Sequence, residues 1–122
     1  MIGHDYNSEM NDELRERFPG TDRLYGQGAV QRHAGSRVAV VGMGGVGSWV
    51  VEALVRSGVG HLTLIDADDI CVSNTNRQLP ALAGQYGRNK AQAMAERCLA
   101  INPLVQVDVV PMFLTGSNLE KL

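Results

Sequence analysis

The sequence predicts an α/β fold that contains one half of a doubly wound parallel sheet behind an N-terminal helical arm. Two short apolar runs, 38–41 and 61–65, have the length and β-branched content of buried strands. Between them lie the glycine-rich turn 42–47 (GMGGVG) and an amphipathic helix, and the second run ends at Asp66. This order of elements is typical of the nucleotide-binding unit of a Rossmann-like sheet.

The glycines of this turn have distinct physical roles. Gly42 permits a tight turn, and Gly47 lets the helix pack close to the strand. Gly44 and Gly45 let backbone N–H groups approach phosphate oxygens, and the helix N-terminus adds a partial positive charge. Asp66 lies where a carboxylate accepts hydrogen bonds from ribose hydroxyls. We therefore expect a nucleotide at this turn.

The composition indicates one small globular domain without a global basic field. The 122 residues are 44% hydrophobic and 20% charged, and the net charge is −2, so a surface for nucleic acid would have to be local. Cys71 and Cys98 form no C-x-x-C pair and the three histidines are scattered, so neither a disulfide framework nor a zinc site is expected. The sequence has no 18-residue apolar run and no leader, from which we expect a cytoplasmic protein without a membrane span.

Residues 1–35 are expected to form an arm and a helix, and residues 36–122 the nucleotide-binding domain. The polar stretch 1–11 predicts an irregular arm, and 12–18 has the length of one or two helical turns before Pro19-Gly20. Thr21 or Asp22 is a candidate cap for a helix that reaches about His33, with Leu24, Gly28 and Gln31 along one side.

The first strand, 38–41, is apolar throughout, which predicts burial on both faces. In the helix that follows, the apolar stripe predicts an inward face of Val46, Trp49, Val50, Ala53 and Leu54. Ser57-Gly58 and Gly60 end this helix before the strand 61–65. Trp49 is therefore expected to pack in the core rather than to provide a stacking surface.

The segment 67–90 has no clear periodicity, and loops of this length in compact domains are usually functional or disordered. Because apolar residues are interspersed among its polar ones, we expect an ordered binding loop. A helix over 88–101 follows, and its predicted inner face consists of Ala91, Met94, Ala95, Cys98 and Leu99. Asn102-Pro103 ends it, 104–110 is a third strand by its alternation, and Ser117 is a candidate cap for a further helix.

These elements make up half of a doubly wound sheet. The strand that would complete its ligand-binding crevice, on the far side of the first strand, would follow Leu122. A sheet of three parallel strands with one open edge is also a poor independent core. We therefore expect the chain to be the N-terminal piece of a longer protein, truncated before its fourth strand.

Four motifs in order carry a resemblance to one family. They are the glycine turn, Asp66-x-Asp68, Ser73-Asn74-x-x-Arg77-Gln78 and Gly87-x-x-Lys90. Together they resemble the ATP-binding core of the ubiquitin-activating-like adenylation family, whose bacterial members include the ThiF, MoeB and HesA proteins. The resemblance runs from about Phe18 to Val110. Within the family, the segments 17–26, 44–49 and 66–78 look most like the tRNA threonylcarbamoyladenosine dehydratase branch.

The resemblance implies that ATP, with Mg²⁺, activates a carboxylate as an acyl-adenylate and that pyrophosphate leaves. In the dehydratase branch the carboxylate belongs to the threonylcarbamoyl group on adenosine 37 of tRNA, and the activated group cyclises with net loss of water. The resemblance also implies a homodimer. Sulfur-transfer proteins or a cysteine desulfurase are further candidate partners.

By the same resemblance, Gly42, Gly44, Gly45 and Gly47 lie at the nucleotide and Asp66 holds its ribose. Ser73 and Asn74 would bind phosphate oxygens, and Arg77 and Lys90 would neutralise the β- and γ-phosphates. Asp68 would lie near the metal or orient Arg77. Arg23, in preference to Arg17, would reach the partner subunit's site. A second aspartate, which binds Mg²⁺, is expected beyond Leu122, so this chain alone is expected to be inactive.

Other functions compete with this interpretation. The first is adenylation of the C-terminal glycine of a ubiquitin-like sulfur carrier, which C-x-x-C zinc ligands and a reactive cysteine downstream would indicate. The second is an NAD-dependent oxidoreductase, which leaves Asn74, Arg77 and Lys90 unexplained. The third is a scaffold without catalytic activity, against which the two cations argue. A covalent role for Cys71 is also conceivable, but its apolar neighbours favour a buried structural thiol.

Overall fold

The computed structural model describes the backbone of residues 2–122 and the side chains of residues 9–122. Its elements are the helices α1 (Ile2–Arg17), α2 (Pro19–Tyr25), α3 (Ala29–Ala34), α4 (Gly47–Arg56) and α5 (Lys90–Ile101), the strands β1 (Arg37–Val41), β2 (His61–Ile65) and β3 (Gln106–Val110), and the 3₁₀ turns η1 (Val72–Asn74) and η2 (Leu119–Lys121). Within residues 2–122, no helix is both long and apolar enough to cross a bilayer.

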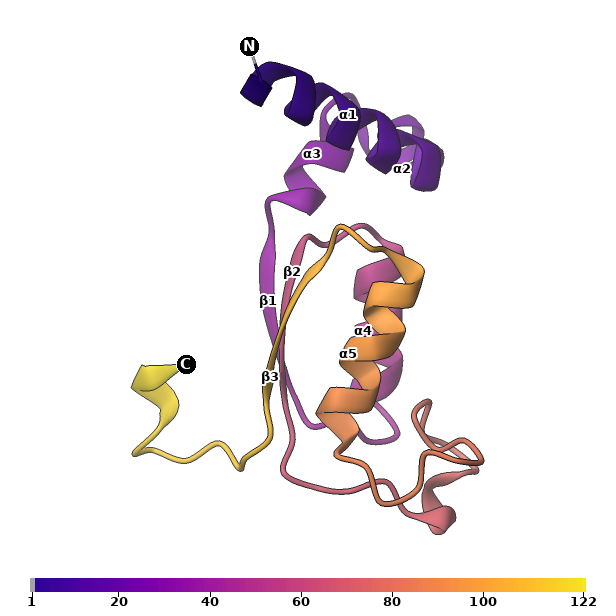
Figure 1. The fold of residues 1–122 in the computed structure, drawn as a ribbon, viewed down its shortest axis with the longest axis vertical. Coiled ribbons are helices and arrows are strands. Elements are labelled where there is room, and N and C mark those ends of the chain that lie inside the picture. Colours follow the sequence, from indigo (N-terminus) through magenta and orange to yellow (C-terminus); the bar gives the residue numbers. More distant parts are fainter. Residues whose placement is uncertain (1) are drawn as a thin grey trace.

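The three strands form one parallel sheet in the order β1-β2-β3, with Val38 opposite Leu62 and Leu62 opposite Val107. The crossover helices α4 and α5 both lie on one face of this sheet (Figure 1). Parallel strands joined by helical crossovers are the predicted half of a doubly wound fold, so the predicted α/β fold class is confirmed.

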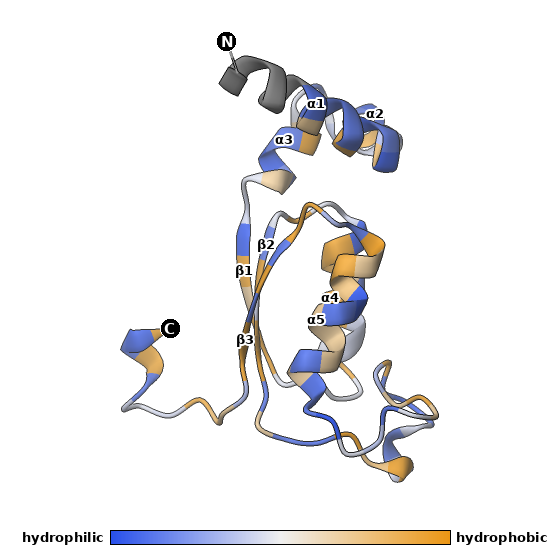
Figure 2. Cartoon of the chain, viewed as in Figure 1, coloured by the Kyte–Doolittle hydropathy of each residue, from blue (hydrophilic) through white to orange (hydrophobic). Residues whose placement is uncertain are grey.

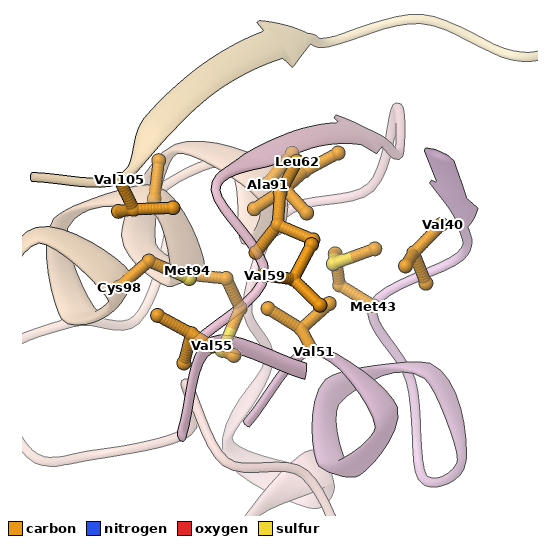
Figure 3. Close-up of a cluster of buried hydrophobic side chains, with 12 residues drawn as sticks. Val40, Met43, Val51, Val55, Val59, Leu62, Ala91, Met94, Cys98 and Val105 are labelled. Atoms are coloured by element: carbon orange, nitrogen blue, oxygen red, sulfur yellow. The ribbon is translucent and has the colours of Figure 1, made fainter. Parts of the chain in front are cut away.

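The core fills the space between the sheet and these two helices (Figure 3). Leu62 and Leu64 of β2 and Met94 of α5 have no exposed surface. The full cluster consists of Val40, Met43, Val51, Val55, Val59, Leu62, Leu64, Ala91, Met94, Ala95, Cys98 and Val105. Because its members come from β1, α4, β2, α5 and the segments next to them, this cluster fixes where the strand ends and their loops lie.

The prediction that the first strand is buried on both faces was wrong. Arg37, Ala39 and Val41 are exposed, Val41 with 57% of its surface, whereas Val40 is buried. Side chains alternate between the two faces of a strand. Within residues 2–122 both crossover helices cover the same face, so alternate residues of β1 point to solvent.

The predicted inner face of the helix after the glycine turn was also wrong. The buried residues of α4 are Ser48, Val51, Glu52 and Val55. Val46, Trp49 and Val50 of the predicted face are 78%, 54% and 41% exposed. Two of the four buried residues, Ser48 and Glu52, are polar. A pattern of apolar residues alone therefore does not identify the inner face of α4. The predicted end was correct, since α4 stops at Arg56 before Ser57-Gly58.

The N-terminal region is more helical than predicted. Helix α1 begins at Ile2 where an irregular arm was expected over 1–11, of which Met1 lies outside the described residues. The single helix expected to His33 is instead α2 and α3, separated at Gly26 and Gly28, whose φ angles of +99° and +88° cannot continue a helix. Figure 2 shows the coloured part of α1 and most of α2 as hydrophilic.

Helix α5 has the predicted inner face except for Leu99, which is 45% exposed. It begins at Lys90 rather than at residue 88 and ends at Ile101, as predicted, and the third strand begins at Gln106 rather than at residue 104. Ser117 does not cap a helix, since its hydroxyl bonds to Thr115 and only the 3₁₀ turn η2 follows.

Candidate functional site

The glycine turn joins β1 to α4 at the carboxyl edge of the sheet, and we call residues 42–47 the glycine loop. Gly42 has φ +89°, and its N–H donates to the carbonyl of Ile65 at 2.8 Å. A Cβ on Gly47 would lie 1.6 Å from the carbonyl oxygen of Gly42, so only glycine fits there. Among the described residues, the N–H groups of Gly44 and Gly45 have no backbone acceptor. The loop therefore presents free donors in front of a helix N-terminus.

Asp66, at the end of β2, is fixed by the backbone around it. One carboxylate oxygen accepts the N–H of Met43 at 2.6 Å and the other accepts the N–H of Asp68 at 2.8 Å. Its own N–H donates to the carbonyl of Val110 at the end of β3. Because a carboxylate has about four lone-pair positions, both oxygens can still accept hydrogen bonds from a ligand.

A cavity of about 190 Å³ lies beside Asp66 at the carboxyl edge. Its walls are Val41, Gly42, Ile65, Asp66, Ala67, Asp68, Met112, Phe113 and Leu114. The last three residues follow β3 and give the cavity an apolar side opposite the carboxylates. Sequence reasoning missed this trio. The signal was available, because parallel topology brings the residue after β3 next to the residue after β2.

The segment after β2 is an ordered loop, as predicted. Asn74, which is 8% exposed, accepts the N–H of Cys71 through Oδ1 at 2.9 Å and so closes the turn η1. Further along, the N–H of Ile70 donates to the carbonyl of Arg88, and the N–H of Gly87 donates back to the carbonyl of Ile70. These two hydrogen bonds hold the beginning and the end of the segment 67–90 together.

The side chain of Arg77 lies over the glycine loop. Its Cγ and Cδ are each 3.4 Å from the position that a Cβ on Gly45 would take. The guanidinium donates to the carbonyl of Ser73 at 3.2 Å and to Asn76 Oδ1 at 2.9 Å. Trp49 Nε1 donates to the carbonyl of Arg77 at 2.9 Å. The aliphatic part of Arg77 therefore packs against Gly45, while Ser73 and Asn76 fix the guanidinium at the same edge of the sheet.

Lys90 is the first residue of α5, and its N–H donates to the carbonyl of Asp68 at 3.0 Å. The residue is 7% exposed. Within the part of the chain that the structure describes, its side chain forms no ion pair. Its stem is packed away from solvent, but its ammonium group is not among the fully buried polar atoms without a partner, so it stays accessible to an anion that comes from outside the protein.

A profile of the ThiF family matches residues 21–122. That span contains the glycine loop, Asp66, Arg77 and Lys90. The chain belongs to the ThiF family. The family predicted from the four motifs is confirmed.

Relatives of this ThiF-family chain include two tRNA threonylcarbamoyladenosine dehydratases. The protein of Escherichia coli strain K12 is 54% identical over 109 residues, which are 89% of this chain and 41% of that protein. The protein of Haemophilus influenzae is 50% identical over 107 residues, or 88% of this chain and 41% of that protein. The chain thus spans about two fifths of the length of these relatives.

The solved structure of the E. coli dehydratase TcdA with ATP matches the chain with a TM-score of 0.85 and 54% identity, covering 88% of this chain and 44% of that one. Its complex with AMP gives the same values. A sulfur carrier protein adenylyltransferase from Thermus thermophilus is 41% identical over 81 residues, or 66% of this chain and 30% of that protein. The relatives of this chain therefore include tRNA threonylcarbamoyladenosine dehydratases and a sulfur carrier protein adenylyltransferase.

In this ThiF-family chain, most predicted site residues gather at the carboxyl edge. They are Gly42, Gly44, Gly45, Gly47, Asp66, Asp68, Ser73, Asn74, Arg77 and Lys90. Arg23 is not among them, because it is exposed on α2 at the opposite end of the sheet (Figure 1). Arg17 lies at that end too and pairs with Glu13 at 3.0 Å.

The two cysteines of the ThiF-family chain have opposite surroundings. Cys71 is exposed at the start of η1, so the prediction of a buried thiol was wrong. Cys98 is fully buried in the core, and desolvation raises the pKa of its thiol to about 11. No group of three or more His, Cys, Asp or Glu side chains suited to a metal ion occurs in the described part of the chain.

Proposed function

We propose that the full protein uses ATP to adenylate the carboxylate of the threonylcarbamoyl group on tRNA adenosine 37, and that the activated group then cyclises with net loss of water. The observation that carries this proposal is the set of groups at the glycine loop, where free N–H donors, the guanidinium of Arg77 and the buried Lys90 lie at one edge of the sheet. The 54% sequence identity to a tRNA threonylcarbamoyladenosine dehydratase whose structures contain ATP and AMP supports ATP and a tRNA as the substrates.

Each residue has a role in this proposal. The N–H groups of Gly44 and Gly45 bind phosphate oxygens. The carboxylate of Asp66 accepts hydrogen bonds from the ribose hydroxyls, and the cavity next to it binds the nucleoside. Asn74 donates through Nδ2, since its Oδ1 already accepts the N–H of Cys71, and Ser73 adds its hydroxyl. These contacts fix the α-phosphate for attack by the carboxylate.

Arg77 and Lys90 stabilise the charge that builds up on the β- and γ-phosphates as pyrophosphate leaves. Such electrostatic stabilisation is strongest when cationic groups are fixed before the reaction begins. Arg77 meets this condition through its hydrogen bonds to Ser73 and Asn76, and Lys90 through its burial at the start of α5.

Mg²⁺ would accompany the ATP phosphates and shield their charge. Among the described residues the candidate ligand is Asp68, whose exposed carboxylate borders the cavity. Mg²⁺ bound to nucleotides typically uses one or two carboxylates together with phosphate oxygens and water, so this site fits as part of a ligand set.

The proposed enzyme is a cytoplasmic homodimer, since its tRNA substrate is cytoplasmic and its site needs a second copy. Arg23 lies on α2, and the glycine loop lies at the opposite edge of the sheet (Figure 1). A contribution of Arg23 to the nucleotide site therefore requires the other subunit. A sulfur-transfer protein or a cysteine desulfurase remains a candidate further partner by family resemblance.

A second candidate function is adenylation of the C-terminal glycine of a sulfur-carrier protein. The relative from Thermus thermophilus favours it, and the same glycine loop, Arg77 and Lys90 would serve it. Both functions share the adenylation step and differ in the acyl substrate.

The test is to follow conversion of ATP to AMP and pyrophosphate by the full protein with each substrate separately, either tRNA bearing threonylcarbamoyladenosine or a carrier ending in Gly-Gly. We expect turnover with the tRNA alone, abolished by Arg77→Ala and by Lys90→Ala and retained by the exposed control Arg32→Ala. Turnover with the carrier alone would select the second candidate. Absence of AMP with both substrates, together with binding of NAD, would overturn adenylation.

A further inference from the structure

A second cavity, of about 300 Å³, lies at the amino edge of the sheet, opposite the candidate nucleotide site, and the helices α1 to α3 lie over this edge (Figure 1). None of the residues assigned to the nucleotide site lines it. One side of the cavity is apolar and consists of Met10, Leu14, Ala34 and Leu104. Because one water molecule takes up roughly 30 Å³ in the liquid, the cavity has room for a molecule of roughly ten non-hydrogen atoms.

The other side of the cavity is polar and lies where the three strands begin. Arg37, His61 and Gln106 are register partners across β1, β2 and β3, so their side chains share one face of the sheet. Among the described residues, Arg37 has no acidic partner. His61 Nε2 lies 2.7 Å from Asp108 Oδ2, so in the neutral ring Nε2 carries the hydrogen and Nδ1 is an acceptor. The polar side therefore provides a cationic donor and, next to an aspartate, an acceptor.

Asn102 independently indicates that the cavity holds a hydrogen-bond acceptor. The residue lines the cavity and is 1% exposed. Its Oδ1 accepts the N–H of Leu104 at 3.1 Å, whereas its Nδ2 donates to none of the described residues. This nitrogen is not among the fully buried polar atoms without a partner, so it keeps access to the cavity. Because buried donors are nearly always hydrogen-bonded, a molecule in the cavity is expected to supply the acceptor.

We propose that this cavity binds a free amino acid with an apolar side chain. The carboxylate of the amino acid pairs with Arg37 and accepts a hydrogen bond from Asn102 Nδ2, and its side chain packs against the apolar side of the cavity. Its ammonium group donates to His61 Nδ1, on the ring that Asp108 holds. Because the walls come from both the helical arm and the sheet, the bound amino acid joins these two parts. Binding requires no nucleotide, so this inference is independent of the proposed function.

The test is isothermal titration calorimetry of the full protein with L-leucine as the probe. We expect L-leucine to bind, and to bind more tightly than L-leucinol, which lacks the carboxylate, and 4-methylpentanoate, which lacks the ammonium group. The Kd for L-leucine should rise about tenfold or more in Arg37→Gln, the effect of one charge-assisted hydrogen bond. Arg15→Gln, at an exposed position of α1 outside the cavity, is the matched control and should leave this Kd unchanged.

Asn102→Asp tests the buried donor. It keeps an oxygen for the N–H of Leu104 but replaces the donor nitrogen by a negatively charged oxygen, so binding of L-leucine should be abolished. Because Arg37 is exposed, Arg37→Gln tests the site even if Asn102→Asp does not fold. A wild type that binds no L-leucine, an unchanged Kd in Arg37→Gln, or L-leucinol that binds as tightly as L-leucine would each overturn the inference. None of these results would affect AMP formation, on which the proposed function depends.

Discussion

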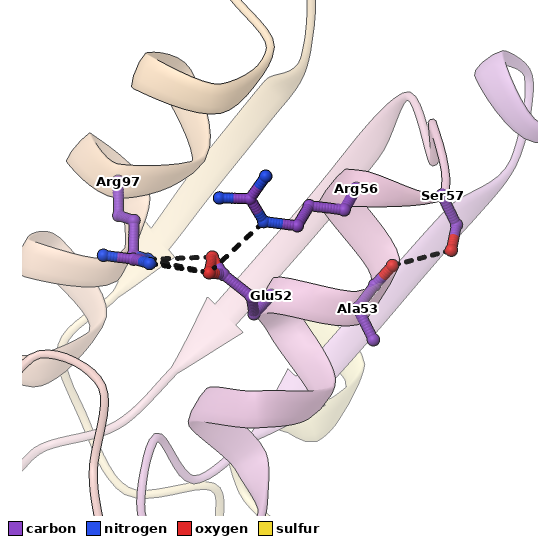
Figure 4. Close-up of polar contacts among 5 residues, drawn as sticks. All are labelled: Glu52, Ala53, Arg56, Ser57 and Arg97. Carbon is purple, nitrogen blue, oxygen red and sulfur yellow. Dashed lines mark hydrogen bonds and ion pairs between the residues drawn. The ribbon is translucent and has the colours of Figure 1, made fainter. Parts of the chain in front are cut away.

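Arg97 on α5 holds the carboxylate of Glu52 on α4, with Nε 2.8 Å from Oε1 and Nη2 2.8 Å from Oε2 (Figure 4). The Glu52 side chain is 12% exposed, and Arg56 lies 3.5 Å from the same carboxylate. This pair joins the two helices that cover the sheet. The hydrogen bonds from Arg97, followed by its charge and that of Arg56, outweigh desolvation and hold the pKa of Glu52 below its ordinary 4.5.

Glu52→Gln is expected to destabilise the protein by about 1–3 kcal/mol at pH 7, because it leaves the guanidinium of Arg97 without its counter-charge. Urea denaturation measures this loss. The matched control is Glu96→Gln, whose carboxylate pairs with Arg88 but is 54% exposed, and whose effect should be much smaller. Equal effects of the two variants would contradict a special role for the buried pair.

The same pair makes stability depend on pH. Since the pKa of Glu52 is lower in the folded state, its ionised form favours folding above the ordinary pKa of 4.5, and this contribution is lost as the pH falls through the lower, folded pKa. The stability difference between the wild type and Glu52→Gln should therefore shrink as the pH falls below about 5. Urea denaturation of both proteins at several pH values measures this difference. A difference in unfolding free energy that stays constant with pH would contradict an ionic pairing of Glu52 with Arg97.

Two glycines of the glycine loop should respond to alanine in opposite ways. At Gly47 a Cβ would lie 1.6 Å from the carbonyl oxygen of Gly42, so Gly47→Ala is expected to cost about 3 kcal/mol or more of stability. At Gly44 the nearest atom would be Gln78 Nε2 at 3.7 Å, an ordinary contact, so Gly44→Ala should stay within about 1 kcal/mol of the wild type.

The two variants separate folding from binding. Gly44→Ala keeps the fold but places a methyl group where phosphate approaches, so its affinity for ATP should fall at least about tenfold. Thermal denaturation and ATP titration of both variants check these expectations. Normal ATP affinity in Gly44→Ala would mean that the phosphates bind elsewhere.

The features that the sequence predicted correctly depend on neighbours close in the chain. The glycine loop, its position between two strands and the stop after Arg56 follow from local backbone requirements, and the inner face of α5 follows from its apolar residues. The face of α4 does not. Ser48 and Glu52 are buried because Ser48 Oγ donates to the carbonyl of Gly44 and accepts the N–H of Leu79, while Glu52 accepts hydrogen bonds from Arg97, 45 residues away.

The candidate site likewise combines features that depend on residues close in the chain with features that depend on distant contacts. Asp66, Arg77 and Lys90 were identifiable because their motifs follow strand ends and helix starts, which parallel topology brings to one edge. The apolar wall of the cavity at 112–114 belongs to no motif, and its position depends on the pairing of β3 with β2. The burial of Lys90 and of Gln78 depends on how the loop packs under α4, which the order of residue types does not encode.

The two cysteines should differ in reactivity. Cys71 is exposed, whereas Cys98 is buried with a pKa of about 11. Iodoacetamide at about pH 8 should label Cys71 alone in the native protein and both cysteines in urea, because the thiolate is the reactive form. Mass spectrometry of the peptides distinguishes the sites, and native labelling of Cys98 would mean that the core between α5 and the sheet opens.

Lys90→Met should leave the stability of the nucleotide-free protein within about 1 kcal/mol of the wild type and, in the proposed reaction, abolish AMP formation. The residue is 7% exposed, but its ammonium group is not among the fully buried polar atoms without a partner, so the change to methionine relieves no large desolvation cost and keeps the packing of the aliphatic stem. In the proposed reaction the same change also removes the cation that stabilises the leaving pyrophosphate, so AMP formation should fall about a hundredfold or more. Lys121→Met, exposed in η2, should alter neither the Tm nor AMP formation. Full activity in Lys90→Met would remove this residue from the site, and a much lower Tm would mean that the variant disturbs the fold and not the site alone.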